Sequence, residues 1–190
     1  MKVVAFNGSA RRDGNTAALI RHVFAELEKE GIETEMIQLA GRNITGCAAC
    51  YKCFETKNRR CALGGEMNEF IAKMEEADAI ILASPTYFAD ITPSIKALME
   101  RAGFVARANG NMFRRKAGAA VVSVRRGGAI HAFDSLNHFF TIEEMVVVGS
   151  NYWNAGMGLE PGEVEKDAEG VETMRVLGRN MAWLLKKISG

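Results

Sequence analysis

The first stretch whose residue types could do chemistry lies near the start of the chain, at residues 7–16. An apolar run at residues 3–6 ends there in small and hydroxylated residues, and a helical pattern follows directly. The backbone N–H groups at the start of a helix are unpaired and lie at the positive end of its dipole, so they attract anions. Five further groups that suit a phosphate lie in the same stretch: Ser9, Arg11, Arg12, Asn15 and Thr16. The stretch therefore predicts a phosphate site.

The glycine spacing of this loop excludes two common phosphate motifs. No Gly-Lys-Ser/Thr follows Gly14, so the loop is not a Walker A sequence. Gly8 and Gly14 are too far apart for the G-x-G-x-x-G dinucleotide fingerprint. Both observations argue against an NTPase and against a dinucleotide-binding Rossmann domain. An ordinary strand–helix turn with a polar cap remains the alternative.

The second chemical feature is a string of four cysteines, which are all the cysteines of the chain. The string is C-x2-C-x2-C-x7-C and consists of Cys47, Cys50, Cys53 and Cys61. Thiolates three residues apart can converge on one metal centre, as in ferredoxin-type ligation, although the last spacing is longer here and no proline follows Cys61. Three states stay open: a 4Fe–4S cluster, a zinc ion held by four thiolates, and free or redox-active thiols.

Length and charge narrow the class of protein. The chain has 190 residues, so we expect one domain over residues 1–190. It carries 24 Lys and Arg against 23 Asp and Glu, and this balance points to neither nucleic acid nor membrane as a partner. No apolar run approaches the length of a transmembrane helix, and Met1 and Lys2 lead directly into a strand rather than a signal peptide. We therefore expect a soluble cytoplasmic protein.

Apolar patterning alternates between strands and helices along the chain. Strands are predicted at residues 3–6, 33–39, 79–83, 117–124 and 145–148, and helices at residues 15–30, 67–74, 94–101, 129–140 and within 162–187. Pro93 suits the first position of the third helix. This alternation predicts an α/β protein with a parallel sheet and helices on both faces.

Ligands of such sheets bind beyond the carboxyl ends of the strands. Aromatic residues and glycines follow three of the predicted strands, in segments 84–92, 125–128 and 150–154. Gly127 and Gly128 would permit close backbone approach, and the aromatic residues would suit a flat conjugated ring. The alternative makes these aromatic residues ordinary core or surface side chains. Their gathering at the edge that also holds the phosphate loop favours a ligand.

Segments 8–16, 84–88 and 125–128 together resemble the NADPH-dependent FMN reductase family, and the resemblance continues through residues 149–153. Within that family the chain is similar to the iron–sulfur flavoproteins and their cluster-free relatives. The resemblance implies a flavodoxin-like three-layer α/β sandwich with a five-stranded parallel sheet in the order 2-1-3-4-5. In flavodoxin itself FMN lies at the switch point of this order.

The resemblance also implies a set of cofactor-binding residues. The FMN phosphate would be held by Ser9, Arg11, Asn15 and Thr16. The isoalloxazine ring would lie along Pro85, Thr86, Tyr87 and Phe88, and would be bordered on its other side by Arg125, Arg126, Gly127 and Gly128. Iron–sulfur flavoproteins tolerate a long final cysteine spacing, so a 4Fe–4S cluster on the four cysteines fits the resemblance. Cluster-free relatives carry similar strings, which leaves occupancy open.

Two functions follow from the resemblance. In the first, NAD(P)H reduces bound FMN, which passes electrons to a small acceptor such as a flavin or a quinone. In the second, FMN and a cluster relay single electrons between protein partners. The absence of a Ser-His-Asp or paired-carboxylate pattern fits both, because the cofactor would supply the chemistry. Aromatic residues on exposed turns and an open ring site also predict a homodimer or homotetramer.

Overall fold

The framework of the molecule is a parallel sheet in which β1 lies between β2 and β3. The strands are β1 (Lys2–Asn7), β2 (Glu33–Gln38), β3 (Ala79–Pro85), β4 (Ala117–Val124), β5 (Val146–Val147) and β6 (Ala155–Met157). The order β2-β1-β3-β4-β5 confirms the predicted flavodoxin-like arrangement, and β6 is an additional strand that pairs with β4. The computed structural model describes residues 1–188, so the last two residues of the expected 1–190 domain lie outside it.

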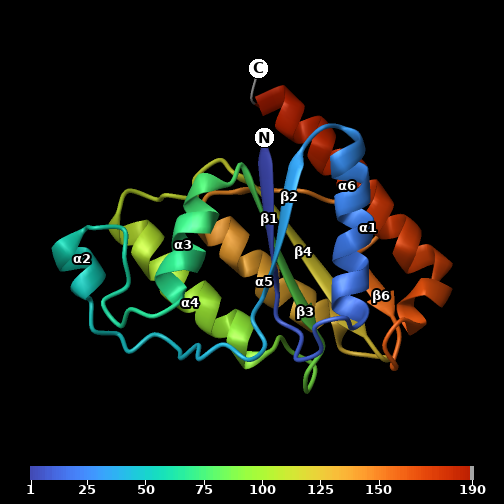
Figure 1. The fold of residues 1–190 in the computed structure, drawn as a ribbon, viewed down its shortest axis with the longest axis horizontal. Helices are drawn as coiled ribbons and strands as arrows, with labels where there is room; N and C mark the ends of the chain where they lie inside the picture. The colour runs from blue at the N-terminus through green and yellow to red at the C-terminus, as the bar shows by residue number, and fades with distance from the viewer. Residues whose placement is uncertain (189–190) are drawn as a thin grey trace.

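Helices cover both faces of the sheet (Figure 1). They are α1 (Asn15–Lys29), α2 (Lys52–Thr56), α3 (Met67–Glu76), α4 (Pro93–Ala108), α5 (Ala129–Ile142), the 3-10 helix η1 (Glu163–Lys166) and α6 (Ala168–Ile188). Helices α1 and α6 lie on one face, and α3, α4 and α5 lie on the other, while α2 stands apart beyond α4 (Figure 1). Within residues 1–188, none of these helices combines the length and the apolar character needed to cross a bilayer.

The central strands are buried on both faces, as their continuous apolar runs predicted. In β1, Val3 and Ala5 pack beneath α1 and α6, whereas Val4 and Phe6 pack beneath α3 and α4. Successive side chains of a strand point to opposite faces, so one apolar run supplies two cores. Both cores are built from apolar side chains, so the loops that follow the strands are the parts left to bind a ligand.

Four elements of the fold differ from the sequence prediction. Strand β5 has two paired residues where residues 145–148 were expected, and α4 continues through Gly103 to Ala108 instead of ending near residue 101. Neither α2 nor β6 was predicted. Strand β6 reads Ala-Gly-Met, which has no alternation and no β-branched residue, and its pairing with β4 is a contact between distant segments. Local patterning therefore carries no signal for it.

A buried carboxylic acid lies between α4 and α5. Glu143 is 1 % exposed, and its Oε2 has no hydrogen-bond partner within residues 1–188. Burial is the main cause that raises the pKa of Glu143 to about 7, with Glu144 adding to the rise and Arg107 opposing it. The fold therefore prefers the neutral form of this side chain.

We expect the Glu143→Gln variant to be more stable than the unmutated protein at pH 8, by on the order of 1–3 kcal/mol. The folded pKa of Glu143 lies above its unfolded value. The stabilisation from the neutral acid is therefore complete below the ordinary glutamate pKa of 4.5 and is lost as pH rises through about 7. Urea unfolding between pH 5 and 8 measures the effect, with Glu69→Gln, an exposed position on α3, as the control. An unchanged pH slope in Glu143→Gln would contradict the assignment.

Candidate functional site

A cavity of about 190 Å³ opens at the carboxyl edge of the sheet, where the loop after β1 meets the segments after β3, β4 and β6. This edge is the lower one in Figure 1. The cavity is lined by Ser9, Arg11, Asn15, Thr16, Pro85, Thr86, Tyr87, Ser123, Val124, Arg125, Gly158 and Leu159. The structure thus brings together Ser9, Arg11, Asn15 and Thr16 of the phosphate candidates, without Arg12, and four of the eight predicted ring residues.

The N-terminus of α1 faces this cavity without a cap. Gly14 is the N-cap residue, so no side chain satisfies the first turn of the helix. The backbone N–H groups of Asn15, Thr16 and Ala17 donate to no acceptor within residues 1–188. Three unpaired donors at the positive end of a 15-residue helix form an anion site.

The side chains of the loop are already fixed by the protein. The Ser9 hydroxyl oxygen accepts the N–H of Arg11 at 3.1 Å, and the Thr16 and Ser123 hydroxyl groups are 2.7 Å apart. The Arg11 guanidinium reaches across the cavity and donates from Nη1 to the carbonyl of Leu159 at 3.0 Å. These contacts join the loop after β1 to β4 and to the segment after β6, so the site is held together before any ligand arrives.

Asn15 also holds the far wall of the cavity. Its Oδ1 accepts the N–H of Gly162 at 2.9 Å, which ties the segment after β6 to the start of α1. Gly158 lies directly against this amide, because a Cβ at that position would be 2.7 Å from Asn15 Nδ2 and 2.7 Å from the Val164 nitrogen. Only glycine lets the two segments approach so closely.

Thr86 places an unsatisfied hydroxyl group in the wall of the cavity. Its backbone N–H donates to the Ser123 carbonyl at 2.9 Å and extends the pairing of β3 with β4. Its Oγ1 is buried and has no partner within the described residues. Buried polar atoms are nearly always paired, so an orphan at a cavity wall is a position for a polar ligand atom.

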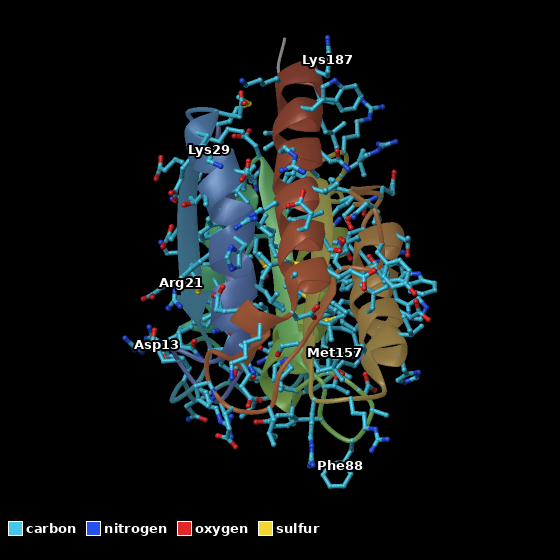
Figure 2. The ribbon with its side chains drawn as sticks, turned by 90° about the vertical axis from the view of Figure 1, so that its right-hand side faces the viewer. Asp13, Arg21, Lys29, Phe88, Met157 and Lys187 are labelled. Carbon is cyan, nitrogen blue, oxygen red and sulfur yellow. The ribbon has the colours of Figure 1, made fainter. Side chains whose placement is uncertain are left out.

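The residues after Thr86 form a tight two-residue turn. Tyr87 and Asp90 exchange backbone hydrogen bonds of 2.7 and 2.9 Å, while Phe88 and Ala89 between them have φ values of 47° and 63°. A left-handed backbone conformation costs about 1–3 kcal/mol for each residue that is not glycine. Phe88 is fully exposed at the tip and points away from the molecule (Figure 2). It does not line the cavity.

The turn is anchored to α5 through Asp90. The Asp90 carboxylate accepts the Ile91 N–H at 2.7 Å and the Ser135 hydroxyl at 2.8 Å. These two hydrogen bonds, in that order, lower the pKa of Asp90, and His131 at 3.6 Å adds to the effect. The charged carboxylate therefore fixes the strained turn against the helix that follows the glycine pair.

The segment after β4 divides between two cavities. Arg125 lines the first, whereas Arg126, Gly127 and Gly128 line a second cavity of about 300 Å³ beside Tyr152 and Trp153. Gly128 has a φ of 89°, and a Cβ there would lie 2.9 Å from the Ala89 Cα. Its lack of a side chain lets the turn after β3 pack against the turn after β4.

Four lining residues of the first cavity were not predicted: Ser123, Val124, Gly158 and Leu159. Ser123 and Val124 lie at the end of a predicted strand, so their position at the edge was available from the sequence. Gly158 and Leu159 follow β6, and no local sequence pattern predicts that strand.

The four cysteines line a separate, narrow cavity against α4. Burial is the main cause that raises the pKa of the Cys53 thiol, and the neighbouring Cys61 and Cys47 add to it. Within residues 1–188, no three Cys, His, Asp or Glu side chains are arranged to hold a single metal ion. This cavity has no lining residue in common with the cavity at the carboxyl edge.

The backbone around the cysteines has an unusual shape. Ala49 and Tyr51 have φ values of 49° and 53°. Alternation of right- and left-handed residues turns successive N–H groups inward and forms concavities that bind anions and iron–sulfur centres. The rings of Tyr51, Phe54 and Phe104 cover this part of the chain, with centroids 6.0 to 6.3 Å apart.

Comparisons with known proteins agree with this architecture. The sequence model of a family described as NADPH-dependent FMN reductase matches residues 1–160. An iron-sulfur flavoprotein of Methanocaldococcus jannaschii is 38 % identical over 195 residues, with 99 % of each chain covered. An iron-sulfur flavoprotein of Methanosarcina thermophila is 29 % identical over 190 residues, covering 99 % of this chain and 97 % of the relative.

Among solved structures, a WrbA-like flavodoxin from Agrobacterium tumefaciens superposes with a TM-score of 0.69. The alignment covers 98 % of this chain and 97 % of the flavodoxin at 15 % identity. At that identity the likeness concerns the fold, which is flavodoxin-like.

Thr86→Val tests whether the orphaned hydroxyl group contacts a cofactor. Removing a buried unpaired hydroxyl should stabilise the ligand-free protein by about 1 kcal/mol. The same change should weaken FMN binding about fivefold, which is the loss of one neutral hydrogen bond. Urea unfolding and fluorescence titration with FMN give the two values, and Thr86→Ser, which keeps the hydroxyl, should bind FMN normally. Unchanged FMN affinity in Thr86→Val would show that this hydroxyl meets no cofactor atom.

Proposed function

The chain belongs to the NADPH-dependent FMN reductase family, and we propose that it is an oxidoreductase in which a nicotinamide dinucleotide reduces bound FMN. The reduced flavin then passes its electrons to a small acceptor, such as free flavin or a quinone. FMN would lie at the carboxyl edge of the sheet, in the cavity beside the first turn of α1. The donor and the acceptor would reach it from the open side of that cavity.

The observation that carries the proposal is the set of unsatisfied donors in one cavity. The free N–H groups at the start of α1, together with Arg11, suit the phosphate of FMN. The orphaned Thr86 hydroxyl suits a polar atom of the ligand farther along the same wall. These features fit FMN, since they supply anion binding at one end and a hydrogen-bonding wall at the other.

We assign no redox chemistry to the protein's own side chains. FMN, when bound, supplies the hydride and electron transfer. The cavity lining among the described residues contains no His, Asp, Glu or Cys, and the roles we assign to its side chains are binding and orientation. We assign phosphate binding to the first turn of α1 and Arg11, positioning of the ring to Pro85, Thr86 and Tyr87, and charge at the rim to Arg125.

The exposed aromatic residues at this edge bear on assembly. Phe88 and Tyr152 project from turns that border the two cavities, and Trp153 packs on Tyr152 with ring centroids 4.6 Å apart. They support the expected homodimer or homotetramer, with an interface that passes near the cavity and leaves its open side accessible.

Anaerobic titration of the purified flavoprotein with NADPH and with NADH tests the proposed reaction. We expect the flavin absorbance to bleach with at least one nicotinamide and to return when free flavin or a quinone is added. The rate should fall in Arg125→Ala, which loses a charge at the rim, and should hold in Arg12→Ala, which does not line the cavity. A flavin that only dithionite or reduced ferredoxin can bleach would refute nicotinamide as the donor.

A second candidate function is single-electron transfer through a 4Fe–4S cluster on Cys47, Cys50, Cys53 and Cys61. Two observations favour it. All four cysteines line one cavity, and the backbone between them is left-handed at Ala49 and Tyr51, a conformation that occurs in the backbone concavities around iron–sulfur centres. The relatives from Methanocaldococcus jannaschii and Methanosarcina thermophila are named iron-sulfur flavoproteins. A cluster, when bound, would add a one-electron centre to the two-electron flavin.

Cys53→Ser separates the two cofactors. Iron and acid-labile sulfide should be present in anaerobically prepared unmutated protein and should be lost in the variant, because the cluster needs four thiolates. FMN content should stay normal, since the cysteine cavity and the carboxyl-edge cavity have no lining residue in common. Near-zero iron with normal flavin in the unmutated protein would leave the cysteines as thiols or ligands of another metal.

A further inference from the structure

Arg101 on α4 is buried against residues 45–64, which contain the four cysteines and are called the cysteine segment below. Arg101 is 4 % exposed, although arginine is rarely buried without partners. All three of its hydrogen bonds go to the cysteine segment. Nε donates to the Cys61 Sγ at 3.2 Å, Nη2 donates to the Gly64 carbonyl at 2.8 Å, and Nη1 donates to the Thr45 carbonyl at 3.4 Å.

The hydrogen bonds of Arg101 leave its charge uncompensated. No carboxylate within residues 1–188 forms an ion pair with it, and two of its three acceptors are neutral carbonyl groups. Guanidinium stays charged in proteins, and burying an unpaired charge is costly. The third acceptor is the Cys61 sulfur, so a thiolate of the cysteine cavity is the group placed to supply negative charge directly to Arg101.

From these contacts we infer that Arg101 is the positioning residue and the counter-charge of the cysteine site. Thr45 and Gly64 stand on either side of the cysteine string, so one planar guanidinium ties both ends of the string to α4. Its Nε holds the sulfur of Cys61, which lines the same cavity as the other three cysteines. The inference rests on the proposed cluster and assigns to Arg101 the compensation of its negative charge.

The contacts of Cys61 explain how this last cysteine is held in place although seven residues separate it from Cys53. The Asn68 side chain accepts the Cys61 N–H at 2.7 Å and donates to the Cys61 carbonyl at 3.2 Å. With Arg101 on its sulfur, Cys61 is held by α3 and α4 rather than by its distance from Cys53. The neighbouring Glu100 accepts the Cys47 N–H at 3.3 Å, so the first and last cysteines are both fixed to α4.

Three variants distinguish the effect of the Arg101 charge from the effect of its planar set of N–H donors. Arg101→Lys keeps the charge but offers one ammonium group in place of the planar fork, and Arg101→Gln removes the charge. Arg107→Gln is the matched control, because Arg107 lies on the same helix and donates to the Ile142 carbonyl, away from the cysteines.

The first experiment is anaerobic reconstitution of the full-length flavoprotein with ferrous iron and sulfide. Groups that orient metal ligands typically contribute 10- to 100-fold to metal affinity, so Arg101→Gln should release iron to a chelator about 10- to 100-fold faster. Its remaining cluster should have a more negative midpoint potential, because a nearby positive charge is gone. Arg101→Lys should restore the potential while still losing iron, and Arg107→Gln should match the unmutated protein.

The second experiment needs no cluster. Hydrogen exchange of the iron-free protein should be faster over residues 45–64 in both Arg101 variants and unchanged in Arg107→Gln and in Cys53→Ser. Exchange of the central strands in the same samples shows that the variants are folded. If the unmutated protein takes up no iron, both the proposed cluster and the counter-charge role of Arg101 are overturned. Hydrogen exchange over residues 45–64 then tests only whether Arg101 positions this segment. Equal iron retention, equal potential and equal exchange in Arg101→Gln would overturn the whole inference.

Discussion

Burial of the central strands on both faces is the constraint on which the rest of the structure depends. β1, β3 and β4 carry apolar side chains on each side, so helices must cover both faces and every polar function is confined to the loops at the strand ends. The order β2-β1-β3-β4 then brings the loops after β1, β3 and β4 to one edge. That edge holds the cavity assigned to FMN.

Each of the two candidate sites is marked by electrostatics that the protein leaves incomplete. At the carboxyl edge, the first turn of α1 has unpaired N–H donors and a glycine cap that cannot satisfy them. At the cysteine cavity, Arg101 brings a buried charge with no carboxylate among the described residues to balance it. A phosphate would gain from the free N–H donors at the start of α1, and a thiolate-bound cluster would offset the cost of the buried Arg101 charge.

The two sites differ in how rigidly they are built. The loop after β1 is cross-linked to β4 and to the segment after β6 by Thr16 and Arg11, and the strained turn at Phe88 is held to α5 by Asp90. The cysteine segment instead leaves the carboxyl edge after β2 and runs outside α4 (Figure 1). It is tied to the body of the protein by the side chains of Asn68, Glu100 and Arg101, by the hydrogen bond from the Arg59 N–H to Asn109, and by the packing of Tyr51 and Phe54 on Phe104.

The layered α/β fold, the loop after β1 and the cysteine string can all be predicted from the sequence. Those features are local, because continuous apolar runs, a glycine before a helix and short cysteine spacings can be recognised within a few residues. The folded structure was needed to show that Arg125 and Arg126 line different cavities, that β6 completes the site with Gly158, and that Phe88 points outward. It alone brought Arg101 to Cys61, 40 residues away in the chain. Such contacts arise when segments that are distant in the chain pack together, and the sequence around a residue does not show which distant residues it will contact.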